Sequence, residues 1–286
     1  MTAVTAGVGH ARPARNSVPV LTRAWRWLGR HAIGIYAALA LVYMFLPIFV
    51  VVLFSFNNPL GRYNFTWQGF TTRNWTNVCG VAGMCHALGL SLKIGVLSTI
   101  VSTLLGSLIA FAVVRHRFTG RAGINLLIFL PMATPEVVMG SSLLALFVNM
   151  NVNLGFATIL IAHIMFNISF VVVTVKARLQ GLDPRLEQAA MDLYANEWQT
   201  FRRITFPLVF PGILAAALLA FSLSFDDFII TNFNAGSQTV TFPMFVWGAA
   251  QRGIPPQINV IGTLMFLTAL VVTLVGTFAG RRRAVR

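Results

Sequence analysis

The chain has 286 residues, of which 57% are hydrophobic and only 10% are charged. A soluble globular domain carries roughly 25% charged residues, so this composition excludes an ordinary soluble protein. The net charge of +14 does not indicate a nucleic-acid partner, because the basic residues lie in clusters between long uncharged stretches.

Six apolar stretches are long enough to cross the hydrocarbon core of a membrane, which requires about 20 residues of helix. None of them alternates between apolar and polar residues, so they predict helices rather than the strands of a membrane barrel. Pro131 and Pro135 predict a kink or an unwound segment near the start of the third. We therefore expect an all-α polytopic membrane protein whose six transmembrane helices cover residues 33–56, 88–114, 124–148, 154–175, 207–230 and 258–279.

The Lys and Arg residues divide unevenly between the connections. Residues 1–32, the loops after the second and fourth helices and the tail 281–286 are rich in them, whereas the opposite connections hold mainly Arg62, Arg73 and Arg252. Because cytoplasmic segments retain positive charge, both termini are predicted to be cytoplasmic. The apolar stretch after the basic N-terminal arm is too long for a signal peptide, so we expect a multi-pass protein of the cell (inner) membrane whose transmembrane domain is 33–280.

Cys79 and Cys85 are the only cysteines and fall in the first outward loop, residues 57–87. Two thiols without further ligands nearby do not indicate a metal site, and the five histidines form no ligand cluster. An oxidising compartment permits one local disulfide, while two free thiols fit the sequence equally well. His163 lies within the fourth helix and is expected to be a hydrogen-bonded packing residue.

The loop after the fourth helix, residues 176–206, is long enough to carry structure of its own. Asp183 before Pro184 predicts the start of one short helix, and Asn196 is a candidate N-cap for a second. Their apolar faces are expected to be Leu186, Ala189, Ala190 and Leu193 in the first, and Trp198, Phe201 and Ile204 in the second. Two such helices at a membrane surface fit an interfacial anchor as well as a docking element.

The same loop resembles the EAA loop of the permeases of ABC importers. The family pattern is Glu-Ala-Ala, three residues, Gly, nine residues, Ile, one residue and Leu-Pro; its positions here are Gln188-Ala189-Ala190, Tyr194, Ile204, Phe206 and Pro207. The resemblance implies a coupling helix that docks on a nucleotide-binding subunit and transmits ATP-driven closure to the membrane helices. The residues that it assigns to ATPase coupling are Leu186, Glu187, Gln188, Ala189, Ala190, Asp192, Leu193 and Tyr194.

Three positions depart from the family pattern: Gln188 replaces Glu, Tyr194 replaces Gly and Phe206 replaces Leu. A Gly at such a turn usually serves a positive φ, a conformation that strains a bulky residue. Tyr194 therefore implies either a different turn or weaker coupling.

Three acidic residues, Glu136, Asp226 and Asp227, lie in or at the edge of apolar stretches. A carboxylate within a membrane is costly and usually faces a bundle interior or a water-filled path. One interpretation is a negatively lined path for a cationic solute. The other is that the two aspartates bond Ser, Asn or backbone groups, and that Glu136 pairs with a basic residue of a partner subunit.

Four segments, 135–139, 224–228, 239–243 and 252–259, resemble the spermidine/putrescine permeases of the PotC/PotI type. The resemblance extends over about residues 33–280 and implies the MetI-like ABC importer permease fold and polyamine uptake by alternating access. Related permeases for iron, thiamine, phosphonates or sugars share this frame and are the first alternative. An integral membrane enzyme or a channel is the second.

The chain has no Gly-x-x-x-x-Gly-Lys-Ser/Thr sequence and hence no P-loop. ATP and Mg²⁺ are accordingly expected on separate ATPase subunits, and this chain is expected to be a transport subunit with no catalytic residues, metal or cofactor of its own. The resemblance implies three kinds of partner: a second permease (a paralogue or an identical copy), two ATP-binding cassette subunits and an extracytoplasmic solute-binding protein.

Overall fold

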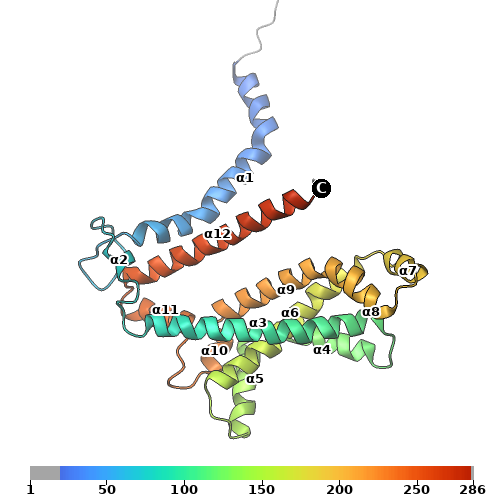
Figure 1. The fold of residues 1–286 in the computed structure, drawn as a ribbon. Coiled ribbons are helices and arrows are strands. Elements are labelled where there is room, and N and C mark those ends of the chain that lie inside the picture. Colours follow the sequence, from blue (N-terminus) through green and yellow to red (C-terminus); the bar gives the residue numbers. More distant parts are fainter. Residues whose placement is uncertain (1–19, 285–286) are drawn as a thin grey trace, which may run out of the picture. The chain divides into compact units, whose positions relative to one another are not determined.

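The computed structural model describes residues 20–284, with side chains for residues 31–276. Positions 1–19 of the predicted basic arm and the last two positions of the predicted tail lie outside the described residues. Within 20–284 the chain is helical apart from turns, loops and one isolated antiparallel bridge between Asn57 and Phe70 (Figure 1). The prediction of an all-α chain is confirmed.

Five of the described helices are long and apolar enough to cross a membrane, and one bent pair of helices brings the number to six if the pair counts as one span. The five are His31–Phe54, Met84–Arg115, Phe156–Gln180, Glu197–Asp226 and Pro256–Gly276. Five of the six predicted stretches therefore coincide with one of these helices, and the third coincides with the bent pair. The first span is the end of a longer helix, α1 (Val20–Phe54), so the predicted basic arm becomes helical before the membrane begins.

The third predicted stretch is interrupted, as its two prolines indicated, and the break divides it into two helices. α4 (Arg121–Ala133) and α5 (Glu136–Asn149) are bent by 107° relative to each other. Thr134 is extended, as expected of the residue before a proline, and Pro135 has no N–H with which to continue the helix. Pro131 remains inside α4, so only the second of the two prolines marks the break.

The fifth span begins and ends earlier than predicted. It starts in α8 (Glu197–Thr200), continues through a π-helical turn (Phe201–Thr205) and ends with α9 (Phe206–Asp226). A separate helix, α10 (Ile229–Asn234), follows after two residues. The break consists of Asp227 and Phe228, and the predicted stretch ran across it to residue 230.

The chain divides into two compact units, one of residues 55–261 and one that combines residues up to 54 with those from 262 onward. In the second unit α1 and the part of α12 (Pro256–Ala284) from residue 262 onward approach each other at two points. Phe45 and Phe266 meet there edge to face, with ring centroids 6.4 Å apart, and a Cβ on Gly262 would lie 3.3 Å from the Val51 side chain.

In the unit of residues 55–261, α3 (Met84–Arg115) packs along α6 (Phe156–Gln180) and α9 around a buried aliphatic core. A Cβ on Gly106 of α3 would lie 2.7 Å from the Val171 side chain of α6, so glycine is what permits this close approach. A second cluster of buried apolar side chains joins α5, α6 and α10.

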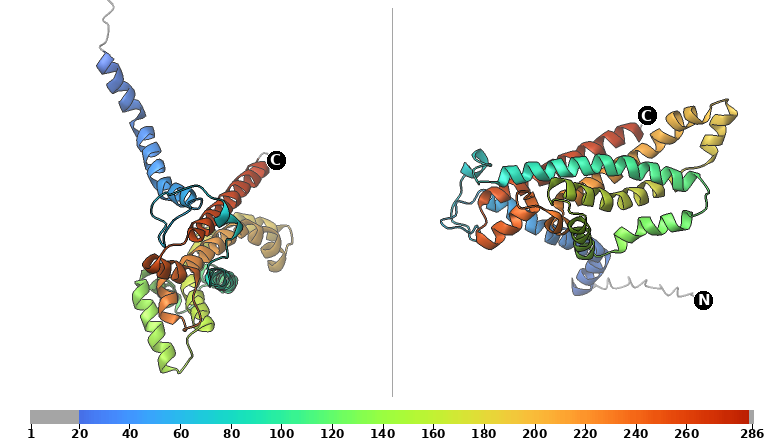
Figure 2. Two further views of the ribbon diagram at one scale, coloured as in Figure 1. Left: turned by 90° about the vertical axis from the view of Figure 1, so that its left-hand side faces the viewer. Right: turned by 90° about the horizontal axis from the view of Figure 1, so that it is seen from below.

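The two ends of this unit carry different elements (Figures 1 and 2). One end holds α8 and the short helix α7 (Arg185–Asp192), which come from the loop 176–206. The other end holds α2 (Arg73–Thr76) and α11 (Phe242–Arg252). Helix α3 runs from one end to the other, and at about 1.5 Å per residue its 32 residues span about 48 Å.

Candidate functional site

The predicted coupling helix is formed, as α7. The Asp183 carboxylate accepts a hydrogen bond of 2.9 Å from the N–H of Arg185, which caps the first turn. At the other end, the N–H of Ala195 bonds to the carbonyl of Ala190 (3.1 Å) and the N–H of Tyr194 bonds to the carbonyl of Met191 (2.9 Å). These two bonds are the Schellman pattern, which ends a helix with one residue in the left-handed conformation.

Tyr194 is that left-handed residue, with a φ of 63°. The sequence left open a different turn or weaker coupling, and the structure contradicts the first, because a tyrosine adopts the left-handed conformation for which glycine usually serves. A non-glycine residue in this conformation costs on the order of 1 kcal/mol. Its side chain is 98% exposed, so none of this cost is recovered by packing within the chain.

The second short helix, α8, follows directly. Asn196 caps it as predicted: its side-chain oxygen accepts from the N–H of Gln199 (2.8 Å), and the Gln199 side chain accepts from the N–H of Asn196 (3.1 Å). Trp198 stacks on Phe201, and Phe201 packs edge to face on Phe111 of α3. The predicted apolar face of α8 therefore holds this loop against the membrane helices.

Glu187 points toward its own chain rather than outward from α7. Both terminal nitrogens of Arg115, the last residue of α3, donate hydrogen bonds to its carboxylate. The Thr205 hydroxyl, just before α9, donates a third. One side chain thus ties α7 to the ends of two membrane helices. The sequence did not single out Arg115, because its partner lies 72 positions away.

Most of the other predicted coupling residues are exposed on α7 or just past its end. Leu186, Gln188, Ala189, Asp192, Leu193 and Tyr194 are all exposed, and Ala190 is half-buried. Leu193 exposes 81% of its surface, and Met191, which sequence reasoning left out, exposes 48%. An exposed apolar patch beside an anchored helix is suited to a protein partner.

The ion pair between Glu187 and Arg115 gives a testable pH dependence. Partial burial raises the pKa of Glu187, but the hydrogen bonds from Arg115 and Thr205 and the charge of Arg115 outweigh it, so the pKa lies below its ordinary value. The pair therefore stabilises the fold at pH values above the ordinary glutamate pKa, and this stabilisation is lost as the pH falls through the lowered pKa.

In a double-mutant cycle of Glu187→Gln and Arg115→Gln, thermal unfolding of the detergent-solubilised permease should give a coupling free energy of about 1 kcal/mol at neutral pH. The coupling should vanish in acid; the same value at every pH would contradict the ionic bond.

The three predicted path residues do not share one environment. Glu136 is the first residue of α5, directly after the break in the third span, and its side chain is exposed. Asp226 is the last residue of α9 and is also exposed. The carboxylate of Asp227 is buried, with a side-chain exposure of 6%.

Asp227 caps α10. Its carboxylate accepts from the backbone N–H groups of Thr231 (2.7 Å) and Ile230 (3.3 Å) and from the Thr231 hydroxyl (2.8 Å). His163 Nε2 lies 3.3 Å from the same carboxylate. For Asp227, the backbone bonds match the second interpretation, in which the aspartates bond Ser, Asn or backbone groups, and the hydroxyl partner is a threonine.

A chain of buried hydrogen bonds extends from Asp227 across the bundle. Ser98 Oγ donates to Ser224 Oγ (2.8 Å), which lies 2.7 Å from His163 Nδ1, and His163 Nε2 lies 2.9 Å from Thr231 Oγ1. Four helices, α3, α9, α6 and α10, contribute one residue each. The expectation that His163 is a hydrogen-bonded packing residue is confirmed, whereas Ser98, Ser224 and Thr231 gave no recognisable signal in the sequence.

Glu136 lies near the two aspartates, and both repel its carboxylate. The approach of α5 to α10 brings them together: a Cβ on Gly140 would lie 2.9 Å from the Phe233 ring, and the Asn234 amide reaches the Gly140 carbonyl at 3.4 Å. The ends of two interrupted spans therefore meet at an acidic locus with two exposed carboxylates. Among the described residues, no group of three or more His, Cys, Asp or Glu side chains is placed to hold a metal ion.

Comparison with known proteins gives a family match and close relatives. Residues 102–282 match the family described as binding-protein-dependent transport system inner membrane component. The chain is 35% identical over 254 residues to the spermidine/putrescine transport system permease protein PotC of Escherichia coli K12, which covers 89% of this chain and 96% of the relative. It is 34% identical over 257 residues to the putrescine transport system permease protein PotI of the same organism, covering 87% and 88%.

Solved structures agree on the fold. A chain of a bacterial ABC transporter involved in the import of the acidic polysaccharide alginate superposes with a TM-score of 0.66 at 15% identity, covering 91% of this chain and 99% of that one. A second structure of a bacterial alginate ABC transporter, solved with an alginate pentasaccharide-bound periplasmic protein, gives the same TM-score. The MetI-like importer fold expected from the sequence is confirmed.

Proposed function

Because the chain belongs to the family of binding-protein-dependent transport system inner membrane components, we propose that it is a permease subunit through which an ATP-driven importer takes up polyamines. The named relatives transport spermidine and putrescine. The chain itself is a transport subunit rather than an enzyme.

The observation that carries the coupling role is the anchored, outward-facing helix α7. Glu187 fixes its inner side to Arg115 and Thr205, while Leu186, Met191 and Leu193 remain exposed. A docked ATPase subunit would cover these apolar groups. When the ATPase pair closes, a displacement of α7 would be transmitted through the Glu187 contacts to the ends of α3 and α9, and tilt the bundle.

Substrate selection is proposed to involve Glu136 and Asp226. Both carboxylates are exposed and lie where the third and fifth spans are interrupted, and interrupted helices at membrane depth occur where they line a cavity. Fixed negative charge lowers the cost of moving a multiply charged amine into a low-dielectric path. Asp227 is assigned a positioning role, because it holds α10 in place beneath Asp226.

The proposed assembly contains this permease, a second permease, two ATPase subunits that bind ATP and Mg²⁺, and an extracytoplasmic solute-binding protein. The basic arm 1–32 and the tail 281–286 are proposed to lie in the cytoplasm on the side of α7. An iron, thiamine, phosphonate or sugar permease is the competing proposal. A phosphonate or a neutral sugar leaves the two exposed carboxylates without a role, whereas iron and thiamine are cations and are distinguished from polyamines by the uptake test.

The test is uptake by proteoliposomes that contain the complete transporter, with its binding protein outside and ATP inside. Labelled spermidine or putrescine should accumulate only with ATP, and an excess of either unlabelled polyamine should suppress it. Thiamine, phosphonate or sugar should leave the signal unchanged. Competition by one of those solutes, with no effect of polyamines, would assign the permease to the competing class.

A further inference from the structure

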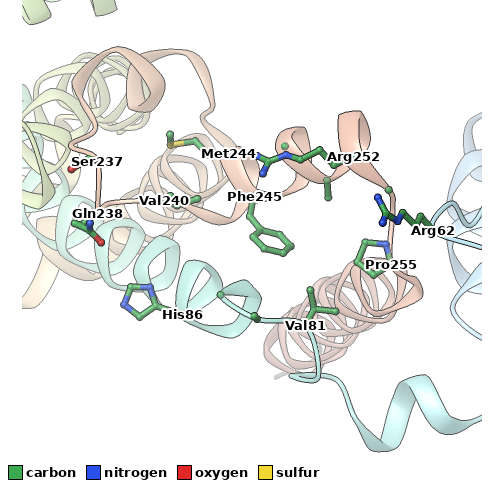
Figure 3. A pocket seen from close by; sticks show the side chains of 15 residues that line it. Arg62, Val81, His86, Ser237, Gln238, Val240, Met244, Phe245, Arg252 and Pro255 are labelled. Atoms are coloured by element: carbon green, nitrogen blue, oxygen red, sulfur yellow. The ribbon is translucent and has the colours of Figure 1, made fainter.

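A cavity of about 750 Å³ opens at the end of the 55–261 unit that lies opposite the coupling helix (Figure 3). Its walls come from four segments: the loop that contains Arg62, the turn 81–83, the start of α3 at His86, and residues 237–255 with α11. Arg62 lies next to Pro255, and the Arg252 side chain extends toward Met244. The remaining lining is largely apolar, with Met244 and Phe245 among the larger side chains.

The lining of this cavity carries the positive charge of its arginines and no carboxylate. The seven acidic residues of the chain all lie in other segments: Glu136, Asp183, Glu187, Asp192, Glu197, Asp226 and Asp227. Within the described residues, neither Arg62 nor Arg252 is paired with a carboxylate. Two guanidinium groups at a concave, mostly apolar surface are suited to bidentate contact with carboxylates supplied from outside the chain.

The two arginines are held by a rigid framework. A Cβ on Gly253, whose φ is +140°, would lie 2.7 Å from the Arg62 carbonyl, so glycine allows the Arg62 loop to rest against the end of α11. The loop itself is fixed by the buried Asn57 side chain, which donates to Asn64 (2.6 Å) and to the Thr66 carbonyl (2.8 Å). A preformed site loses little conformational entropy when a partner binds.

A disulfide shapes another wall. Cys79 and Cys85 are joined, with their Cα atoms 5.5 Å apart, so of the two states that the sequence allowed the structure has the bonded one. The closed loop between them contains Val81, Ala82 and Gly83, which line the cavity. This bond suits an oxidising, extracytoplasmic compartment, in agreement with the side predicted for residues 57–87 from charge.

The cavity is unsuited to the proposed substrate, because Arg62 and Arg252 repel a polyamine. Its position suits a protein that approaches from outside: His86 at the cavity and Arg115 at the coupling helix lie near opposite ends of the same helix, α3. We infer that this cavity receives acidic side chains of the extracytoplasmic solute-binding protein, with Arg62 and Arg252 as the groups that pair with them. The inference rests on the proposed function for its partner, though not on the identity of the solute.

The test measures binding of the purified solute-binding protein of the same transport system to the complete transporter in nanodiscs of zwitterionic lipid. Arg62→Glu and Arg252→Glu should each weaken binding roughly tenfold and flatten its dependence on salt concentration. Arg73→Glu makes the same charge change on the same side of the membrane, outside the cavity, and should have less than a twofold effect. The paired Cys79→Ser and Cys85→Ser variant should also bind more weakly.

Retention of the ATPase subunits serves as the control for folding in every variant. Equal weakening by all three arginine variants would indicate general attraction of charge and overturn the site, as would unchanged binding in Arg62→Glu and Arg252→Glu. An effect seen only after anionic lipid is added would assign the cavity to a phospholipid headgroup instead. Because docking is measured with the protein and not through uptake, a wrong solute assignment would leave docking intact and show only in the uptake assay.

Discussion

The Leu193→Asp permease is expected to lose its ATPase subunits during purification and to lose uptake with them. Leu193 follows α7 directly and exposes 81% of its surface, so an aspartate there leaves this chain's own packing undisturbed. At a docked interface the same carboxylate would be buried without a partner, which typically costs about 2 kcal/mol or more, equivalent to at least roughly 30-fold weaker association. The measurement is the ratio of ATPase to tagged permease after solubilisation and affinity purification.

The matched control is Leu60→Asp, which introduces the same charge at a leucine with 90% exposure at the other end of the same unit. It should retain the ATPase. Replacement of residues 186–194 by a flexible linker should abolish retention altogether. If the ATPase stays bound in the linker variant, α7 is not the coupling element and the interfacial-anchor interpretation of the loop gains support.

The elements of the fold were largely predictable, because hydropathy over about 20 residues is a strong signal. Five of the six apolar stretches coincide with helices long enough to span a membrane, the third coincides with the bent pair, and Asn196 caps the helix that it was expected to cap. The interruptions were harder to predict. Pro131 and Pro135 look equivalent in the sequence, yet only Pro135 ends a helix, and the boundary at Asp227 depends on a side chain that bonds to groups three and four residues onward.

For the candidate sites too, local features were predictable from the sequence, whereas contacts between distant residues were not. The spacing of the coupling motif located α7, but it left open whether position 194 keeps a positive φ, and the structure shows that it does. What spacing cannot reveal is the direction in which each side chain points. Glu187 turns inward because Arg115 and Thr205 lie beneath it, and these are 72 and 18 positions away in the chain. Such long-range pairs have no local signature.

The Asp226→Asn and Asp227→Asn variants are expected to fail in different ways. Asp226 is exposed, so its amide variant should reach the membrane in normal amount and retain the ATPase, while kcat/KM for spermidine uptake falls roughly tenfold, corresponding to about 1.4 kcal/mol of lost transition-state stabilisation. Glu136→Gln should behave in the same way. Because the effect depends on substrate charge, the loss should be larger for spermidine than for putrescine.

Asp227→Asn should instead reduce the amount of folded permease. The carboxylate accepts from the Thr231 hydroxyl and from two backbone N–H groups and faces His163, and an amide presents one oxygen and a competing donor to these groups. Breaking a buried charged contact of this kind costs about 3 kcal/mol or more. Size-exclusion profiles and thermal unfolding in detergent separate this loss of folded protein from the transport defect of Asp226→Asn. As a control, Glu197→Gln, which replaces an exposed acid at the start of α8, should change neither. Normal uptake in both Asp226→Asn and Glu136→Gln would remove the acidic locus from the translocation path, whatever the fate of Asp227→Asn.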